Sequence, residues 1–316
     1  MKAIRISRFG GPEVMEYLDV PDPVPERGQV LVRLHAAGVN PVEAYIREGK
    51  YMKLPPLPFT PGADGAGIIE ESGTLPVGSR VFVTSSVTGA YAEKAVCAAE
   101  DVYPLSDRMT FAQGAALGVP YGTATWALFY RGQAKRGETV LIHGASGGVG
   151  TAAVQLARAA GLRVFGTAGT PEGLELVKRN GAEAAFNHKE PDYLDKIKGA
   201  AGDHGLDMII EMAAHHNLGK DLPLLAKSGR VVVIGSRGPV EIDARNLMGR
   251  EADIRGITFF SPGAELRAEI YSRISAGIAD GSLNPIVGTA IPLGEAGRAH
   301  QHIMTSSALG KLVLTM

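Results

Sequence analysis

The sequence predicts an α/β protein with two domains, a β-rich domain and a doubly wound parallel-sheet domain. Residues 1 to about 110 contain short β-type runs broken by Pro and Gly. From Glu138 onward, short apolar strands alternate with amphipathic helices. The length of 316 residues and the hydrophobic content of 45% are sufficient for two buried cores.

The expected elements follow from hydrophobic periodicity. Strands of the β-rich part are expected at 29–39, 65–73, 79–86 and 91–97. Fully apolar strands of the second part are expected at 139–143, 163–168, 184–187, 207–212 and 230–235. Helical patterns separate them at 148–161, 171–181, 193–202 and 218–229, so both faces of a parallel sheet are covered. A β-type run at 253–260 and helical patterns at 263–281 and 294–307 precede a last strand, 311–316, which can rejoin the first domain.

Charge and cysteine content exclude several classes of function. The chain has 32 Lys plus Arg against 33 Asp plus Glu, a balance that offers no electrostatic footprint for nucleic acid or an anionic membrane. The start of the chain does not read as a targeting peptide and no run is long enough to span a bilayer, so we expect a cytoplasmic protein. Cys97 is the single cysteine, which rules out an intrachain disulfide and favours a packed apolar role.

The stretch "HGASGGVG", residues 143–150, predicts a dinucleotide-binding turn. It joins an apolar strand to a helix, and a second strand follows at the expected distance. Ala145 replaces the first glycine of the usual pattern, and Gly147 and Gly150 supply the others. Backbone N–H groups of 146–149 would then face a phosphate at a helix N-terminus.

The end of the second strand favours NADPH over NADH. NAD-binding sites place an Asp or Glu there to hold the ribose 2′-hydroxyl. This chain has no acid from Gly166 to Pro171, so a 2′-phosphate would meet no repulsion. His188 or Lys189 could supply positive charge for it. The alternative is an enzyme that binds both cofactors loosely.

Motifs along the whole chain resemble one family. They include "AAGVNPVEAYIREGKY", "LPFTPGADGAG", "GAALGVPYGTATWAL", "HGASGGVG", "NGAEAAFNHKE", "IGSRG" and "GKLVL". Together they resemble the zeta-crystallin type of quinone oxidoreductase, a zinc-free branch of the medium-chain dehydrogenase/reductase superfamily. The resemblance implies a GroES-like catalytic domain, 1–120 with 260–316, and a Rossmann domain, 121–259.

Zinc is not expected. Zinc-dependent relatives place a Cys ligand where this chain has Asn40, and a His followed by Glu where it has Ala63 and Asp64. One cysteine provides no soft ligand set, and the pairs His215 with His216 and His300 with His302 are most simply solvent-exposed. Without a metal Lewis acid, a conjugated acceptor that takes hydride directly is the easier substrate.

Asn40 and Tyr45 are the candidate catalytic residues, because they lie on the segment that resembles the family's active-site loop. Asn40 would orient the substrate or the nicotinamide ribose, and Tyr45 would hydrogen-bond the cofactor or the substrate oxygen. The alternative is a turn-capping Asn and a packed Tyr. The resemblance further implies cofactor contacts at Ser146, Gly147, Gly148, Val149, Gly169, His188, Asn217, Ile234, Gly235, Ser236, Arg237, Ile257, Thr258 and Phe259. Some bacterial relatives carry a Lys where this chain has Gly173, which leaves the 2′-phosphate contacts open.

Three functions are compatible with these features. The leading one is an NADPH-dependent reductase of quinones. The second is reduction of an alkenal, enone or enoyl thioester on the same fold, and the third is a cofactor-binding structural or RNA-binding protein. The balanced charge argues against RNA. We also expect a homo-oligomer, a dimer or tetramer, formed through the edge run 253–260.

Overall fold

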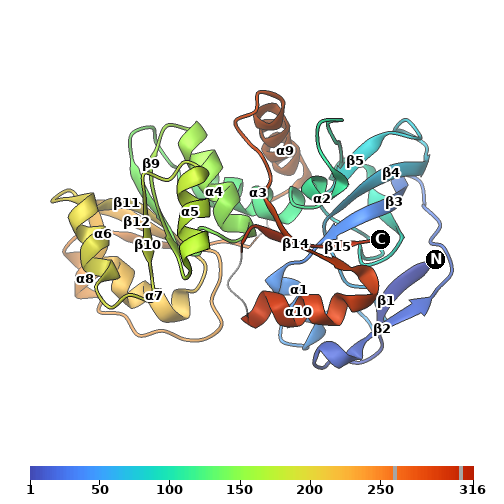
Figure 1. Cartoon of the computed structure of the whole chain (residues 1–316), viewed down its shortest axis with the longest axis horizontal. Coiled ribbons are helices and arrows are strands. Elements are labelled where there is room, and N and C mark those ends of the chain that lie inside the picture. Colours follow the sequence, from blue (N-terminus) through green and yellow to red (C-terminus); the bar gives the residue numbers. More distant parts are fainter. Residues whose placement is uncertain (259–261, 306–308) are drawn as a thin grey trace. The chain divides into compact units, whose positions relative to one another are not determined.

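The computed structural model describes residues 1–258, 262–305 and 309–316, and the chain divides into two compact units. Unit 1 comprises Met1–Val119 and Pro285–Met316, and unit 2 comprises Pro120–Asn284. The mixed α/β class with one β-rich unit and one parallel-sheet unit agrees with the sequence (Figure 1).

The second boundary lies at residue 285, later than the expected residue 260. Side chains of helix α9, Ala264–Ala279, contact the segment 126–131 of unit 2. The Tyr130 hydroxyl donates to Glu269 at 2.8 Å, and the Arg273 guanidinium lies 3.8 Å from the centre of the Phe129 ring. Periodicity describes a helix but not the unit against which it packs.

Unit 1 is built on a seven-stranded sheet. Its order is β14-β15-β3-β4-β5-β7, and β6 also pairs with β3. The strands are β3 Gln29–Gly38, β4 Gly65–Ser72, β5 Arg80–Val83, β6 Lys94–Ala98, β7 Val102–Pro104, β14 Val287–Pro292 and β15 Lys311–Thr315. A separate antiparallel pair is formed by β1 Lys2–Ile6 and β2 Met15–Asp19. Short helical segments are η1 Pro12–Val14, α1 Pro41–Arg47, η2 Ala99–Asp101, α2 Phe111–Gly114, η5 Leu293–Glu295 and α10 Ala296–Thr305.

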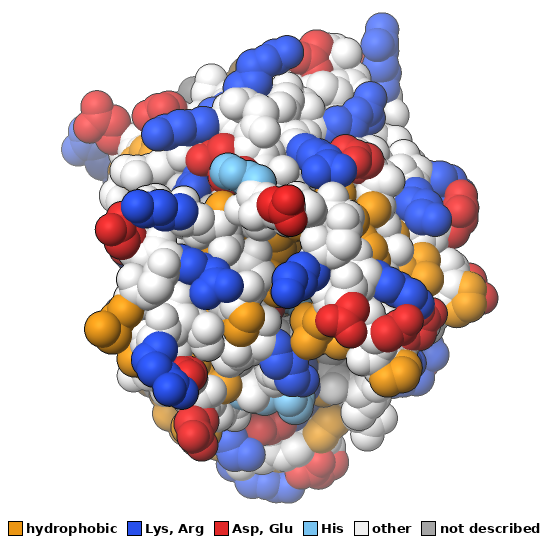
Figure 2. Space-filling model, turned by 90° about the vertical axis from the view of Figure 1, so that its left-hand side faces the viewer, with side chains coloured by type: hydrophobic (Ala, Val, Ile, Leu, Met, Phe, Trp, Pro, Cys, Tyr) orange, Lys and Arg blue, Asp and Glu red, His pale blue; other side chains and the backbone are white. Residues whose placement is uncertain are grey.

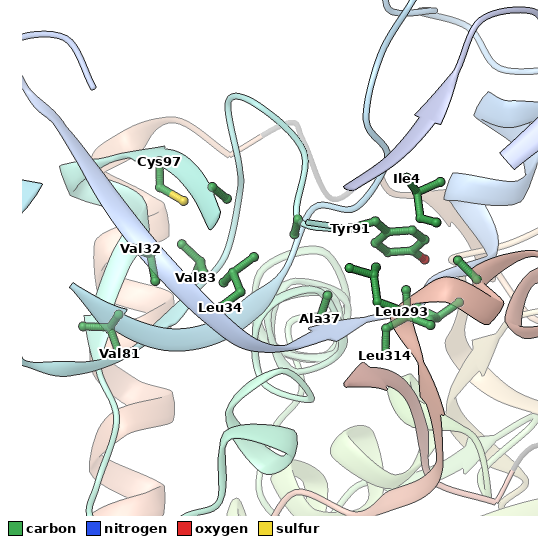
Figure 3. Packing of buried hydrophobic residues seen from close by; sticks show 14 of the residues in the cluster. Ile4, Val32, Leu34, Ala37, Val81, Val83, Tyr91, Cys97, Leu293 and Leu314 are labelled. Carbon is green, nitrogen blue, oxygen red and sulfur yellow. The ribbon is translucent and has the colours of Figure 1, made fainter. Parts of the chain in front are cut away.

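The end of the chain completes unit 1, as the sequence predicted. Strand β15 lies antiparallel to β3, with Val313 opposite Gly38. Figure 3 shows Leu314 and Leu293 of this C-terminal segment packed near Ala37 and Tyr91. Burial of apolar side chains from both ends of the sequence therefore holds one core together.

Helix α1 was not anticipated in the β-rich part. Asn40 is its N-cap, Pro41 occupies the first turn, and Glu43 completes a capping box with Asn40. Seven residues are too few for a clear helical period, so the capping pattern was the available indication.

Unit 2 contains a six-stranded parallel sheet in the order β10-β9-β8-β11-β12-β13. The strands are β8 Thr139–Ile142, β9 Arg163–Ala168, β10 Ala184–Asn187, β11 Leu206–Glu211, β12 Leu225–Val233 and β13 Asp253–Gly256. The helical segments are α3 Gly118–Thr125, which begins in unit 1, η3 Trp126–Arg131, α4 Gly148–Ala159, α5 Pro171–Arg179, α6 Tyr193–Ala201, α7 Ala214–Asp221, η4 Leu222–Leu224, α8 Arg245–Met248 and α9. In Figure 1, α4 and α5 lie on one side of these strands and α6 and α8 on the other. The predicted covering of both sheet faces is confirmed.

One predicted helix in unit 2 is too long. The pattern at 218–229 was expected to be helical throughout, but α7 ends at Asp221 and β12 begins at Leu225. Pro223 lacks the N–H that a continuing helix needs, and the apolar residues that follow it enter the buried sheet instead.

The surface agrees with the balanced composition. On the face shown in Figure 2, Lys and Arg side chains are intermixed with Asp and Glu. In the part of the chain that the structure describes, no helix has both the length and the apolar character needed to cross a membrane.

Candidate functional site

The turn between β8 and α4 has the geometry expected of a phosphate cradle. Gly144 has a φ of 59°, a conformation that favours glycine. Gly147 is the N-cap of α4, and a Cβ on Gly150 would lie only 2.2 Å from the carbonyl oxygen of Gly144. The first N–H groups of a helix lack intrahelical acceptors and lie at the positive end of its dipole. The N–H of Gly147 donates to the Gly144 carbonyl at 3.1 Å within the turn, so the N–H groups of Ser146, Gly148 and Val149 are the candidates for binding an anion.

The start of α5 lies beside this turn. Thr170 caps α5 by accepting a hydrogen bond from the N–H of Gly173 at 3.1 Å. A Cβ on Gly173 would lie 3.3 Å from Oγ of Ser146, which shows how close the two helix starts are. Glycine at this position leaves room between them.

Two basic side chains lie over Gly169. A Cβ on Gly169 would lie 2.9 Å from Nε2 of His188 and 3.1 Å from Cε of Lys189. Burial lowers the pKa of His188, and the charges of His143 and Lys189 lower it further. His188 is therefore a neutral hydrogen-bonding group at neutral pH, and Lys189 carries the positive charge beside Gly169.

The segments after β11 and β12 are linked to each other. The amide of Asn217 donates to Oε1 of Glu211 at 3.4 Å, and the N–H of Ala214 donates to the carbonyl of Gly235 at 3.0 Å. The N–H of Arg237 donates to Nδ1 of His215 at 3.1 Å. The sheet edge thus brings together Asn217 and the turn that includes Ile234, Gly235, Ser236 and Arg237, as expected from the carboxyl ends of parallel strands.

After β13 the structure describes Ile257 and Thr258 and then continues from residue 262. The N–H of Ile257 donates to the carbonyl of Val233 at 3.1 Å, and Thr258 follows it. Ile257 therefore lies beside the end of β12. Phe259, the last expected cofactor contact, lies outside the described residues.

A buried cluster of titratable side chains at the same edge was not anticipated. Nε2 of His143 lies 2.8 Å from Oδ1 of Asp221 and 3.6 Å from Oε2 of Glu211. All three residues are at most 3% exposed. Among the described residues this is the one group of three whose ligand-type atoms are close enough to hold a metal ion.

The sequence contains a pattern that could have indicated part of this cluster. His143 and Glu211 each end a run of apolar strand residues, where a charged group is unusual unless it has a partner. Asp221 lies on α7, 78 residues after His143, so the partner of this imidazole could be found only from the tertiary structure.

Asn40 lies in a buried polar network of unit 1 and is 3% exposed. Its amide nitrogen donates to Asp64 at 2.7 Å and to Glu43 at 3.1 Å. Its amide oxygen accepts a hydrogen bond from Lys311. Both amide protons are therefore used inside the protein, and this arrangement fits the capping alternative better than contact with a substrate.

The network does not fit a zinc ion at the positions used by zinc-dependent relatives. The Lys311 ammonium lies among the donors, 3.7 Å from Oδ2 of Asp64 and bonded to Asn40. Zinc needs several thiolate, imidazole or carboxylate ligands around one point. Here an ammonium group and an amide occupy that place, so we derive no step through zinc.

Tyr45 lies on α1, one turn after Asn40, and is half-buried. It is thus more accessible than Asn40, while Glu43 and Arg47 on the same helix are buried.

The four paired histidines differ in solvent exposure, whereas all four were expected to be exposed. His216 is exposed and His215 and His302 are half-buried, but His300 is completely buried. Nδ1 of His300 lies 3.2 Å from the Arg47 guanidinium, and Nε2 lies 3.2 Å from the Tyr91 hydroxyl. The expectation of an exposed His300 was wrong because α10 turns this residue into the core of unit 1. Burial, reinforced by the Arg47 charge, lowers the pKa of His300 to about 3.

Cys97 is buried in the core of unit 1, as expected. Burial raises the pKa of its thiol to about 12, with a further contribution from Asp101. Such a thiol is not a nucleophile at neutral pH.

Comparisons with known proteins agree with this architecture. Residues 26–107 match the family model described as alcohol dehydrogenase GroES-like domain, and residues 148–275 match the one described as zinc-binding dehydrogenase. A quinone oxidoreductase of Rattus norvegicus is 51% identical over 322 residues, which span 100% of this chain and 98% of the relative.

Solved structures with the same fold cover the whole chain. An NAD-dependent alcohol dehydrogenase superimposes with a TM-score of 0.93 at 27% identity, with 100% of both chains covered. The quinone oxidoreductase from Thermus thermophilus, solved also as its complex with NADPH, superimposes with a TM-score of 0.88 at 33% identity, again over 100% of both chains.

Proposed function

The chain belongs to the quinone oxidoreductase family of the medium-chain dehydrogenase/reductase superfamily, and on that premise we propose that it reduces quinones with NADPH as the hydride donor. The observation that carries the proposal is the glycine turn of 144–150, which leads into α4 in a chain similar to a quinone oxidoreductase over its full length. A nicotinamide cofactor, NADH or NADPH, follows from the family and this turn together.

The preference for NADPH rests on the groups around Gly169. Lys189 offers a positive charge there and His188 offers a neutral imidazole, both within about 3 Å of a Cβ built on Gly169. No carboxylate occurs between Gly166 and Pro171 to hold a ribose 2′-hydroxyl. We infer that these side chains bind the 2′-phosphate. The similar alcohol dehydrogenase is NAD-dependent, so the preference needs its own measurement.

NADPH supplies a hydride from nicotinamide C4 when it is bound. Hydride addition to a conjugated carbonyl moves negative charge to an oxygen, which a hydrogen-bond donor stabilises and a proton then neutralises. We propose that the Tyr45 hydroxyl is this donor. Asn40 contributes indirectly. Its side chain hydrogen-bonds Glu43, Asp64 and Lys311 and so orders the start of α1.

The test is steady-state oxidation of NADPH and, separately, of NADH by chelator-treated protein, with an ortho-quinone and an alkenal as acceptors. We expect faster oxidation of NADPH with the quinone, unchanged by chelator. Faster turnover of the alkenal would favour the enone-reductase alternative. NADPH binding without turnover of either acceptor would favour a structural or RNA-binding role. Electron paramagnetic resonance during turnover would detect a semiquinone and so distinguish one-electron from two-electron reduction.

We also propose that the protein is a cytoplasmic homo-oligomer, a dimer or tetramer. Strand β13 ends the sheet of unit 2, so one of its edges has no neighbour among the described strands. Ile254 on this strand is 37% exposed, which suits pairing with a second copy. A monomeric mass in light scattering at working concentration would contradict this proposal.

A further inference from the structure

Three buried titratable groups of unit 2 have no part in the proposed reduction. They are His143 directly after β8, Glu211 at the end of β11 and Asp221 at the end of α7. Their ligand-type atoms all lie within 4.8 Å of one another. Burying ionisable groups is costly, so an arrangement of this kind needs a physical explanation.

Hydrogen bonds through the Thr167 side chain link the His143 imidazole to the glycine turn. Its Nδ1 lies 3.2 Å from the Thr167 hydroxyl on β9. That hydroxyl accepts a hydrogen bond from the N–H of Gly144 at 3.2 Å. Asp221 holds the other side of the imidazole at 2.8 Å. The position of the turn that faces the pyrophosphate therefore depends on the imidazole and on Asp221.

Glu211 hydrogen-bonds two other segments that are expected to contact the cofactor, one at Asn217 and one that begins at Ile234. Its Oε1 accepts hydrogen bonds from the N–H of Ala213 and the amide of Asn217. Its backbone carbonyl accepts one from the N–H of Ile234 at 2.8 Å. Glu211 thus contacts Asn217 and Ile234 directly, and His143 is linked to the glycine turn through Thr167.

The hydrogen bonds of the cluster require an extra proton. Oε2 of Glu211 and Oδ2 of Asp221 are buried and have no hydrogen-bond partner among the described residues. Two neighbouring carboxylates in a site of this kind cannot both stay ionised, and one proton between them would give both oxygens a partner.

Electrostatics favours the same protonation. Burial raises the pKa of Glu211 to about 7; the charge of His143 opposes this rise, and that of Asp221 adds to it. Burial lowers the pKa of His143, but Asp221 and Glu211 outweigh burial and raise it overall. Three other titratable groups face the cluster: Lys220 on α7, His188 after β10 and Tyr193 on α6.

We propose that Glu211 is a positioning residue for the cofactor, whose protonated carboxyl bonds to Asp221 and holds the cofactor-binding segments in their binding arrangement. The inference rests on the proposed function, because it assumes that these segments bind NADPH. Loss of the proton would place a second negative charge beside Asp221. The carboxylates would then separate, the segments attached to them would move, and the phosphates of NADPH would meet added negative charge. Cofactor binding and retention of this proton are therefore coupled, each strengthening the other.

The variant Glu211→Gln tests the proposal because its amide copies the protonated carboxyl and cannot lose that proton. Its oxygen can still accept from Ala213, and its NH₂ can donate to Asp221. The dissociation constants of NADPH and NADH are measured from the fluorescence of the bound cofactor between pH 6 and pH 8.5. We expect the wild-type constant, divided by that of the variant, to rise about fivefold or more over this range for both cofactors. The ratio cancels any pH dependence that comes from titration of the cofactor itself, because that titration affects both proteins equally.

The matched control is Glu175→Gln, on the exposed face of α5, for which the ratio should stay constant. A constant ratio for Glu211→Gln as well would overturn this inference and leave the proposed function intact. Absence of cofactor binding at every pH would overturn both.

Thermal unfolding of the cofactor-free protein gives a second readout. A carboxyl whose folded pKa is raised contributes stability that is fully present below its unfolded pKa and is lost as the pH rises through the folded pKa. The unfolding temperature of the wild type should therefore fall as the pH rises through about 7, and that of Glu211→Gln should fall less. Equal falls would contradict the proposal. So would stoichiometric Zn²⁺ that stabilises the wild type but not the variant, because the cluster would then be a metal site.

Discussion

We expect the Lys189 side chain beside Gly169 to contribute most to the choice between the two cofactors. His188 lies equally close to Gly169, but its lowered pKa leaves it neutral. An imidazole can hydrogen-bond both a ribose hydroxyl and a phosphate, whereas an ammonium group gains mainly from the phosphate. The preference should therefore depend more on Lys189 than on His188.

At this scale we predict that Lys189→Ala weakens NADPH binding about tenfold and leaves NADH binding nearly unchanged, because one charge-assisted contact to the 2′-phosphate is lost. Dissociation constants from cofactor fluorescence check this. Lys198→Ala is the matched control, since Lys198 is exposed on α6 and should not matter. An equal loss for NADPH and NADH would place Lys189 away from the 2′-phosphate.

At the scale of elements, the approach of α4 to β8 determines whether the turn can hold a phosphate. Gly150 lies in the first turn of α4, where a Cβ would be 2.2 Å from the Gly144 carbonyl and 2.6 Å from Cα of Ala145. Both contacts are with backbone, which cannot rotate away as a side chain could. The helix would have to move, and its first N–H groups would move with it.

Two glycine-to-alanine changes separate packing from helix propensity. Gly150→Ala should destabilise unit 2 by about 1–3 kcal/mol through overpacking and should weaken NADPH binding. Gly199→Ala, in α6, where a Cβ would contact nothing within 4 Å, should stabilise the protein by about 0.5–1 kcal/mol. Urea unfolding and cofactor titration measure both effects. A Gly150→Ala variant that binds NADPH normally would show that the turn tolerates the displacement.

At the scale of the whole molecule, Lys311 joins the two ends of the sequence in unit 1. It opens β15, is 4% exposed, and contacts Asn40 and Asp64, which follow β3 and precede β4. The single ammonium group thus offsets part of the negative charge of the buried Asp64 and Glu43 carboxyls. Removing it would leave uncompensated negative charge in the core.

We therefore predict that Lys311→Met lowers the free energy of unfolding by about 3–5 kcal/mol, a typical cost of breaking a buried ion pair. Lys2→Met removes a lysine of the same unit from an exposed pair with Asp19, and should leave unfolding unchanged. Denaturant unfolding followed by circular dichroism measures both. Equal stability of the two variants would mean that water or rearrangement compensates the buried carboxylates.

Residue patterns alone were sufficient to predict the fold class, the order of most strands and helices, the glycine turn and the lack of an acid after β9. These features are local: each depends on residue spacing of two or 3.6, on Gly and Pro, or on a short motif. Even the return of β15 to unit 1 agreed with its apolar β-type pattern. The short helix α1 and the early end of α7 were missed, because seven residues or one Pro223 carry too little periodicity.

Which distant residues share an environment became known only from the folded arrangement. It buried His300 against Arg47 and Tyr91, committed the Asn40 amide to Asp64 and Lys311, and brought Glu211 and Asp221 to His143. It also attached α9 to unit 2. The physical reason is that the charge, protonation and accessibility of a side chain depend on its neighbours in space, and those neighbours lie as far as 271 residues away along the chain.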